Sequence, residues 1–218
     1  MIGVLAIIAI FFQPNKLCPR IGEIIYINLD NRLDRKKKIC KELNHLGCHY
    51  TRLKGVYNKN GGLGCVRSHI QCIELGIKKE HPNIMIFEDD FMFVDTYKNV
   101  KKKLVNALKE LDGKWDVIML SGNINKDEPY VVTNLNKVKN IQTASGYIVN
   151  KHYYNTLLDN FKESEKNLAD GKSYKIWALD QNWKKLQEKD NWYVFNPTLG
   201  KQYESYSDIE NQVVNYQI

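Results

Sequence analysis

Short apolar runs alternate with amphipathic stretches from residue 23 onward, and this order constrains the fold more than any other feature of the chain. Apolar runs at residues 23–29, 49–53 and 84–87 predict strands. Between them, apolar side chains recur at helical spacing over residues 33–46 and 66–77. A repeated strand–helix–strand order is typical of parallel strands covered by helices. We therefore expect an α/β fold, an α/β/α sandwich with a mostly parallel central sheet.

We expect the remainder of the chain to extend the same layers, so that residues 21–218 form one domain. The further elements predicted are a Lys-rich helix at 100–111, strands at 116–120 and 141–149, and helices at 151–161 and 174–187. Ser145-Gly146, within the second of these strands, indicates a close approach of the backbone to another group. The polar tail after Pro197 is expected to be irregular.

The first twelve residues are almost entirely apolar. They are too few to span a bilayer, which takes about 20 residues. No basic residues precede them, and no small-x-small cleavage site comes before Pro14. We treat residues 1–20 as a separate segment with three open roles: a signal, a membrane anchor that gives peripheral membrane contact, or an extra strand. A cytoplasmic or membrane-associated location is favoured, and a secretory lumen stays open.

The charge of the chain argues against a nucleic acid as partner. The net charge is +7, but only five of the 32 basic residues are arginine. Lysines scattered through predicted helices form a solvated surface more often than a nucleic-acid groove. The sequence contains no Arg-rich stripe, no basic patch interleaved with aromatic residues and no zinc pattern.

The five cysteines are odd in number and include no CxxC pair. Cys65 and Cys72 are seven residues apart, so they can share one helix face as small buried hydrophobes. The pattern predicts neither a zinc site nor a disulfide framework, although a single bridge stays open. A reducing compartment is the favoured setting.

Three consecutive acids, Glu88-Asp89-Asp90, follow the apolar run at 84–87. Ligands of α/β sheets are held at the carboxyl ends of the strands. Adjacent carboxylates repel one another, and a hard divalent cation bound to an anionic substrate would neutralise them. The alternative is that Asp89 or Asp90 caps the next helix while Glu88 faces solvent. Taken locally, both interpretations stand.

The junction after the first strand, from Asn28 and Leu29 to Arg35, suits a phosphate group. A helix begins there, so free backbone N–H groups and the positive end of the helix dipole are available. Arg32 and Arg35 are three residues apart, and guanidinium binds phosphate in a bidentate manner. The alternative is that these arginines form exposed ion pairs with Asp30 and Asp34.

A second helix opens after a run of glycines that ends at Gly64. Small residues at this point let the backbone approach a ligand, and Ser68 can donate to a phosphate or ribose. His69 is one residue further around the helix. We interpret it as a structural core residue, because an isolated helical histidine more often has that role.

Six blocks of the chain, in order over about residues 24–208, resemble those of glycosyltransferase family 25. The family includes bacterial lipooligosaccharide galactosyltransferases and collagen galactosyltransferases. The blocks are INLDNRLDR at 27–35, GCVRSH at 64–69, IFEDD at 86–90, WDVIMLSG at 115–122, TASGYIV at 143–149, and a C-terminal group of Asp180, Pro197, Gln202 and YSDI at 206–209. Each block is weak alone, whereas six in this order are specific.

The resemblance implies a GT-A-like fold, a nucleotide-sugar donor and a divalent metal, Mn²⁺ or Mg²⁺. Asp90 would be the direct metal ligand, with Glu88 as a second ligand, while Glu88 and Asp89 face the ribose or sugar. The donor-binding residues implied are Asn28, Leu29, Arg32, Arg35, Gly64, Ser68, Glu88 and Asp89. A third metal ligand from the C-terminal part is unassigned.

The resemblance also implies an inverting enzyme, in which one carboxylate takes the proton of the acceptor hydroxyl. Asp180 is our candidate for this base and Asp116 the second choice. The faces of Trp177, Trp183 and Trp192 are available for sugar stacking. The expected activity is transfer of galactose or glucose, UDP-linked, to a glycan, glycolipid or glycoprotein. The alternative is a catalytically inert module that binds a nucleotide sugar.

Overall fold

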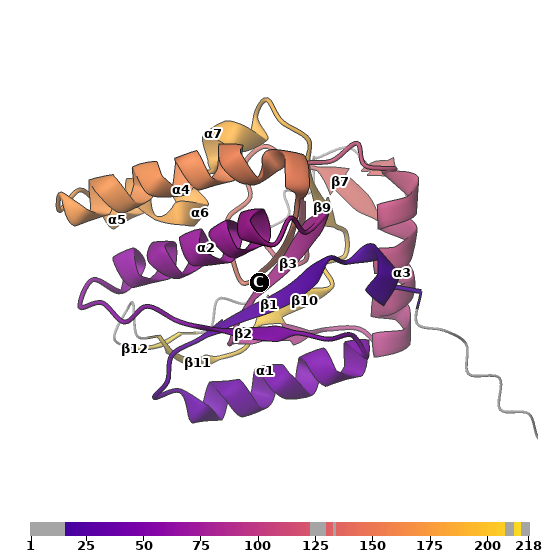
Figure 1. Ribbon diagram of the computed structural model, residues 1–218, viewed down its shortest axis with the longest axis horizontal. Coiled ribbons are helices and arrows are strands. Elements are labelled where there is room, and N and C mark those ends of the chain that lie inside the picture. Colours follow the sequence, from indigo (N-terminus) through magenta and orange to yellow (C-terminus); the bar gives the residue numbers. More distant parts are fainter. Residues whose placement is uncertain (1–15, 123–129, 133, 208–211, 215–218) are drawn as a thin grey trace, which may run out of the picture.

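The computed structural model describes residues 16–122, 130–132, 134–207 and 212–214 (Figure 1). The strands are β1 (Glu23–Asn28), β2 (Thr51–Lys54), β3 (Asn83–Glu88), β4 (Phe91–Phe93), β5 (Val117–Met119), β6 (Tyr130–Val132), β7 (Leu135–Lys137), β8 (Gly146–Asn150), β9 (Trp192–Phe195), β10 (Gly200–Gln202), β11 (Ser205–Ser207) and β12 (Gln212–Val214). The helices are α1 (Leu33–Leu46), α2 (Gly61–Lys78), α3 (Tyr97–Glu110), α4 (Tyr154–Ala169), α5 (Tyr174–Trp177), α6 (Leu179–Asn182) and α7 (Lys184–Gln187), with 3-10 turns η1 (Cys18–Arg20) and η2 (Lys151–Tyr153). The apolar segment 1–12 lies outside the described residues.

Eight strands form one central sheet in the order β2-β1-β3-β8-β5-β9-β7-β6. β1 pairs in parallel with β2 and β3, and β5 pairs in parallel with β9. β8 runs antiparallel to β3 and β5, and β7 runs antiparallel to β9 and β6. Six of these eight strands therefore share one direction. The expected α/β fold with a mostly parallel sheet is confirmed, and β8 and β7 are the two strands that run against the others.

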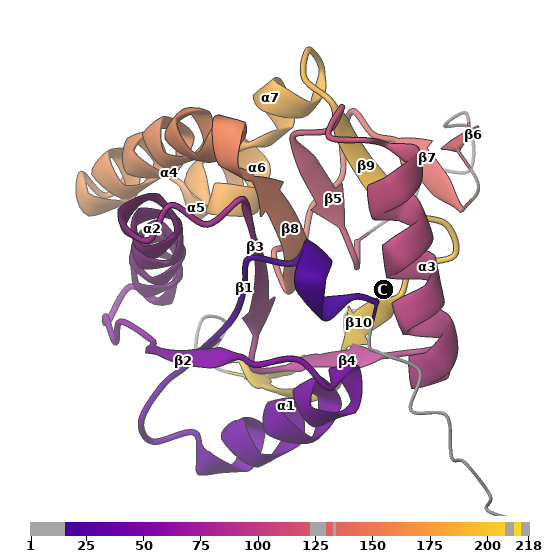
Figure 2. The same ribbon diagram turned by 45° about the vertical axis from the view of Figure 1, so that its right-hand side comes forward.

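Helices cover both faces of the sheet (Figure 2). α2 and α4 pack against each other on one face, while α1 and α3 lie on the other. Successive side chains of β3 alternate between the two apolar clusters: Ile84 and Ile86 pack on the α2–α4 side, Met85 and Phe87 on the α1–α3 side. Because strand side chains alternate with a period of two, the same pattern directs Glu88 toward α2 and the next residue toward α1.

The boundaries of the first two helices differ slightly from expectation. α1 ends where Gly47 takes a left-handed conformation, φ 68°, as the glycine predicted. It begins with Arg32 at the N-cap position, not with Asp30 or Asn31. α2 already starts at Gly61, because the side chain of Asn60 accepts a hydrogen bond from the Leu63 N–H.

The close approach expected at Ser145-Gly146 is made by an aromatic ring. A Cβ on Gly146 would lie 2.6 Å from the ring of Phe91, and one on Gly200 would lie 2.0 Å from it. Neither position can therefore accept a side chain while the ring stays in place. Phe91 thereby anchors β4 and its partner β10 beside the end of β3, where the acids lie.

The C-terminal third departs most from expectation. The helix expected at 174–187 is three short segments, α5 to α7, and residues 192–195 add an unexpected strand to the central sheet. The tail after Pro197, expected to be irregular, contains β10, which pairs with β4, and the β11–β12 pair. These differences matter because β10 brings Gln202 to the acidic segment.

One disulfide joins Cys18 to Cys48 and ties η1 to the end of α1. The sequence left a single bridge open but favoured free thiols. Cys40, Cys65 and Cys72 are free, the last fully buried.

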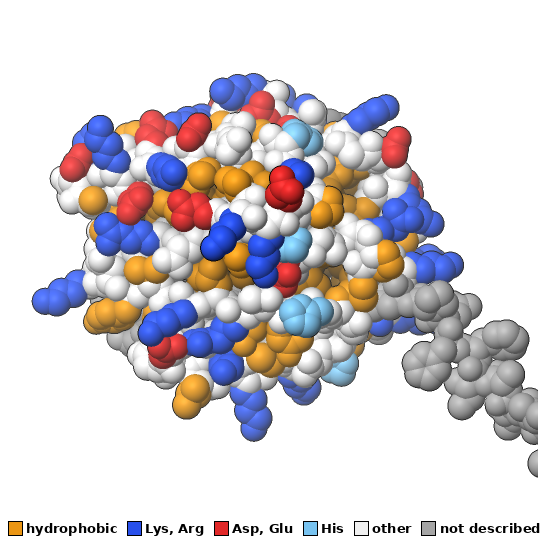
Figure 3. Space-filling model, in the orientation of Figure 1, with side chains coloured by type: hydrophobic (Ala, Val, Ile, Leu, Met, Phe, Trp, Pro, Cys, Tyr) orange, Lys and Arg blue, Asp and Glu red, His pale blue; other side chains and the backbone are white. Residues whose placement is uncertain are grey.

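Charged side chains of both signs lie on the face of the molecule in Figure 3. Lys and Arg alternate with Asp and Glu over its upper half, and Lys and Arg predominate over its lower part. Within residues 16–122, 130–132, 134–207 and 212–214, no helix combines the length and apolar character that crossing a membrane requires.

Candidate active site

A pocket of about 280 Å³ opens where β1, β2 and β3 end and α2 begins. Its lining includes every residue predicted to bind the donor or a metal. These nine residues are Asn28, Leu29, Arg32, Arg35, Gly64, Ser68, Glu88, Asp89 and Asp90. They come from the β1–α1 junction, the first half of α2 and the β3–β4 turn, which meet because the carboxyl ends of parallel strands lie at one edge of a sheet.

Arg35 lies in the α1 wall of this pocket and neutralises two of the three acids. Its buried guanidinium is 3.0 Å from Asp89 Oδ1 and 3.1 Å from Asp90 Oδ2. Burial alone would lower the pKa of Arg35, but the charges of Asp90 and Asp89 outweigh it and raise that pKa. From the sequence alone, we expect a cation to neutralise these acids and Arg35 to bind a phosphate. In the structure, Arg35 binds protein carboxylates instead.

Asn28 holds the loop after β1 against the acidic segment. Its amide nitrogen donates to Asp89 Oδ2 at 2.6 Å and to the Arg32 carbonyl at 3.0 Å. Its amide oxygen accepts from Arg52 Nε at 3.1 Å. Arg32 also pairs with Asp34 at 3.2 Å, so the ion-pair alternative for this arginine is observed as well.

Gln202 of β10 connects the other two carboxylates. Its amide nitrogen donates to Asp90 Oδ1 at 3.2 Å and to Glu88 Oε2 at 3.4 Å. Both carboxylates therefore face one small polar group. Burial, followed by the charge of Glu88, raises the pKa of Asp90 to about 7. The charge of Arg35 lowers this pKa, but burial and the charge of Glu88 outweigh it.

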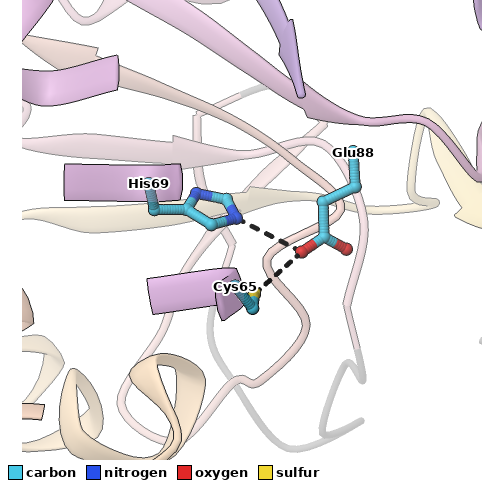
Figure 4. A group of neighbouring side chains, drawn as sticks. All are labelled: Cys65, His69 and Glu88. Atoms are coloured by element: carbon cyan, nitrogen blue, oxygen red, sulfur yellow. Dashed lines mark hydrogen bonds and ion pairs between the residues drawn. The ribbon is translucent and has the colours of Figure 1, made fainter. Parts of the chain in front are cut away.

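Glu88 faces α2, where His69 and Cys65 approach the same carboxylate oxygen (Figure 4). His69 Nε2 is 3.2 Å from Glu88 Oε1, and the Cys65 thiol donates to that oxygen at 3.5 Å. Burial alone would raise the pKa of Glu88, but its hydrogen bonds and the charge of His69 outweigh burial and lower it. The sequence argument treated His69 as structural and Cys65 as a buried hydrophobe. The signal for this cluster was their spacing of four residues, which puts both on one helix face.

Gly64 and Ser68 lie in the first half of α2 and line the pocket. A Cβ on Gly64 would lie 2.5 Å from the Val56 carbonyl oxygen, so the glycine lets the loop after β2 rest on the helix. The Ser68 hydroxyl donates to the Gly64 carbonyl and accepts from the Val56 N–H, both at 2.8 Å. The hydroxyl predicted to contact a phosphate or ribose is thus engaged by the backbone.

Asp180 lies in α6 and is not among the lining residues. It accepts a hydrogen bond from the Thr143 N–H at 3.1 Å. Thr143 has φ 93°, a conformation that side chains rarely adopt, so this bond helps to hold a strained backbone. Burial raises the pKa of Asp180, with a further contribution from the charge of Glu88. Electrostatic interaction with Glu88 indicates that the carboxylate lies near the α2 wall.

Other predicted side chains lie away from the pocket. Trp183 and Trp192 are fully buried in the core, so neither offers a face to a sugar, and Trp177 is half-buried. Asp116 bonds His152 at 2.6 Å and the Asn191 N–H at 2.7 Å. Its carbonyl accepts from Asn150, which pairs with the first residue of β3, so Asp116 lies at the opposite end of the sheet from Glu88.

The pocket, walled by acids and arginines, lies at the carboxyl ends of three parallel strands, where α/β domains bind their ligands. The identity of the domain follows from its sequence. The chain belongs to the glycosyltransferase family 25 (LPS biosynthesis protein), whose family model matches residues 60–171, just over half of the chain. The protein is therefore a glycosyltransferase, and the resemblance seen in the sequence is confirmed.

Similarity to solved structures is distant, and no curated protein matches the chain in sequence. UDP-glucose pyrophosphorylase complexed with UDP-glucose has 11% identity and a TM-score of 0.48, covering 87% of this chain and 79% of its own. A197 from STIV has 10% identity and a TM-score of 0.47, covering 89% and 93%. A glycosyltransferase involved in the glycosylation of the major capsid of PBCV-1 has 9% identity and a TM-score of 0.41, covering 79% and 92%.

Proposed function

We propose that this glycosyltransferase is metal-dependent and inverting, and that it moves galactose or glucose from a UDP-linked donor to a hydroxyl of a glycan, glycolipid or glycoprotein. One observation carries the proposal. The carboxylates of Glu88 and Asp90 converge on Gln202 in the wall of a pocket lined by all the predicted donor-binding residues.

The donor set of this wall fits Mn²⁺ or Mg²⁺. Hard divalent cations prefer carboxylate and amide oxygens, and Glu88 and Asp90 supply the carboxylate oxygens. The oxygen and nitrogen of a side-chain amide exchange positions when the group rotates by half a turn. Such a rotation would place the Gln202 oxygen where its nitrogen now lies. Gln202 then completes the set as the third ligand that the sequence left unassigned. Such a cation would offset the charge that develops on the leaving diphosphate.

The loops after β1 and β2 form the rest of the donor site. Gly55 lets them lie together, since a Cβ there would be 3.2 Å from the side chain of Leu29. Arg32 lies at the start of α1, where free N–H groups and the helix dipole favour a phosphate. Asn28 fixes this loop to Asp89, so the α1 wall is preorganised before the donor arrives.

Asp180 is the proposed general base. Its raised pKa makes the carboxylate a stronger base, which favours transfer of the acceptor proton to it at neutral pH. The hydrogen bond from the Thr143 N–H holds the carboxylate through its Oδ2 oxygen. The expected reaction is a single in-line displacement that inverts the anomeric carbon.

A donor screen tests this function. The purified protein is incubated with Mn²⁺ and a panel of uridine and guanosine diphosphate hexoses, and nucleoside diphosphate release is measured. We expect release from UDP-galactose or UDP-glucose above all other donors, and loss of release in EDTA. Donor binding in a thermal shift without release from any donor would support the inert binding module instead.

A further inference from the structure

We infer that Cys65, His69 and Glu88 form a binding site for a thiophilic divalent cation, Zn²⁺ above all, separate from the Glu88–Asp90 site for a hard cation. The ligand atoms are one thiol sulfur, one imidazole nitrogen and one carboxylate oxygen, and all lie within 4.8 Å of one another. Their directions are visible in Figure 4, where His69 and Cys65 converge on a single oxygen of Glu88.

The spacing of these atoms matches the edges of a zinc tetrahedron. Zinc bonds of about 2.3 Å to sulfur and about 2.0–2.2 Å to nitrogen and oxygen place tetrahedral N and O about 3.4 Å apart, and S and O about 3.6 Å apart. The corresponding distances here are 3.2 Å from His69 Nε2 to Glu88 Oε1 and 3.5 Å from Cys65 Sγ to that oxygen. These two edges therefore need shifts of only about 0.1–0.2 Å to bind zinc, and the third edge, from His69 Nε2 to Cys65 Sγ, is no longer than 4.8 Å.

The ligand types select the metal. Thiolate and imidazole favour zinc over magnesium or manganese, which prefer oxygen. On binding, the Cys65 thiol loses its proton to solvent and becomes the thiolate that bonds the metal. The imidazole binds a metal through the Nε2 lone pair, so the proton that remains on the ring is then on Nδ1.

Tyr147 supports this arrangement from behind the histidine. Its hydroxyl lies 2.7 Å from His69 Nδ1, and both side chains are fully buried. A partner on the second ring nitrogen fixes the ring orientation and the tautomer of a metal-binding histidine. The fourth position faces the pocket, since Cys65, His69 and Glu88 all line it.

The two oxygens of Glu88 face different partners. Oε1 faces His69 and Cys65, while Oε2 faces Gln202 and, through it, Asp90. Zinc on Oε1 would draw this carboxylate away from the hard-cation site. We therefore expect zinc to inhibit transfer, a consequence that rests on the proposed function, whereas zinc binding itself does not.

Cobalt titration tests the site without any activity assay. Co²⁺ is added to the oxidised protein, with its disulfide intact, in buffer without thiols or chelators, and the thiolate-to-cobalt absorption band is followed. We expect one equivalent bound, displaced by Zn²⁺. Cys65→Ser should abolish the band, and Tyr147→Phe should weaken binding by about 10- to 100-fold, the usual effect of losing such a support.

Two controls make the outcome decisive. Cys40→Ser removes a half-buried free thiol from α1, and Asp90→Asn impairs the hard-cation site; both should keep the cobalt band. Circular dichroism verifies that each variant is folded. A wild-type protein without the band, or a band that persists in Cys65→Ser or disappears in Cys40→Ser, would overturn the proposal. Retained zinc binding in a protein with no transferase activity would overturn the proposed function alone.

Discussion

On the α1 side of the acidic segment, Asp89 and Asp90 are held by the guanidinium of Arg35; on the α2 side, Glu88 meets a histidine and a thiol. The α1 side carries the permanent positive charge of Arg35, which neutralises Asp89 and Asp90 without any bound ligand. On the α2 side, the partners of Glu88 are His69 and Cys65, and neither carries a permanent charge. Adjacent acids on one strand end can therefore divide between holding the pocket together and binding what enters it.

The largest expected effect lies near the α2 side, at Asp180. Asp180→Asn keeps an oxygen for the Thr143 N–H but removes the proton acceptor. We expect kcat to fall by about 10²- to 10⁴-fold, the usual contribution of a general base, while donor affinity persists. Turnover and donor titration calorimetry measure the two quantities. Asp116→Asn, at the other end of the sheet, is the matched control. An unchanged kcat in Asp180→Asn would show that Asp180 is not the base.

On the α1 side, Arg35→Met tests the structural role of the ion pairs. Loss of one partner from a buried ion pair costs about 3–5 kcal/mol of unfolding free energy, because the remaining charges are buried without compensation. Urea denaturation measures this loss. Arg32→Met, whose partner Asp34 is exposed, should cost no more than about 1 kcal/mol. Equal losses in the two variants would contradict the division between the walls.

The loss of stability in the Arg35→Met variant should depend on pH in a predictable direction. Burial raises the pKa values of Asp89 and Asp90, whereas Arg35 lowers both, so the variant raises them further. A carboxyl whose folded pKa exceeds its unfolded value destabilises the fold when ionised, and this penalty disappears as the pH falls. The stability gap between variant and wild type should therefore narrow toward acid pH, and a gap that widens would contradict the account.

Cation binding between the walls should weaken in acid. Asp90 must be ionised to bind Mn²⁺, and its pKa is raised to about 7, whereas the pKa of Glu88 is lowered. Loss of one required ionisation weakens binding by up to about tenfold per pH unit below that value. Calorimetric titration of Mn²⁺ from about pH 8 down to about pH 6 checks this. A constant affinity over that range would show that Asp90 does not titrate with binding.

A smaller effect than those of Asp180 and Arg35 is expected at Ser68, in the first half of α2. Ser68→Ala leaves the Val56 N–H and the Gly64 carbonyl without their partner, and such a loss costs about 1–2 kcal/mol of stability. Chemical denaturation and donor titration together distinguish the two roles considered for this residue. A large rise in the donor Kd with unchanged stability would restore the direct ligand contact predicted from the sequence.

The layers of the fold and the lining of the pocket were accessible to sequence reasoning. Strand and helix periods differ, so β1, α1, α2 and β3 could be placed, and the parallel pairing of β1 with β3 brought their carboxyl ends together. β9 was missed because it has four residues and directly follows short helical segments. The reversal of β8 has no local signal, since strand direction depends on how the chain returns to the sheet.

Partners of the charged residues could not be predicted in the same way. Arg35 and Asp89 are 54 positions apart, and Gln202 is 112 positions from Asp90. Adjacent carboxylates require a neutralising charge, but that requirement does not say whether an arginine or a cation provides it. The structure supplies the arginine for one side, and the convergence of Glu88 and Asp90 on Gln202 is where we propose the cation.

Nucleoside diphosphate release by the wild type and by Asp90→Asn, each with Mn²⁺ and with EDTA, tests the central claim most directly. Asparagine keeps the shape of the side chain and removes the charge that the cation requires. The account predicts release by the wild type with Mn²⁺ and little or no release in the other three samples, with both proteins folded by circular dichroism. Equal release by the variant, or wild-type release that persists in EDTA, would contradict a metal-dependent transferase built on these acids.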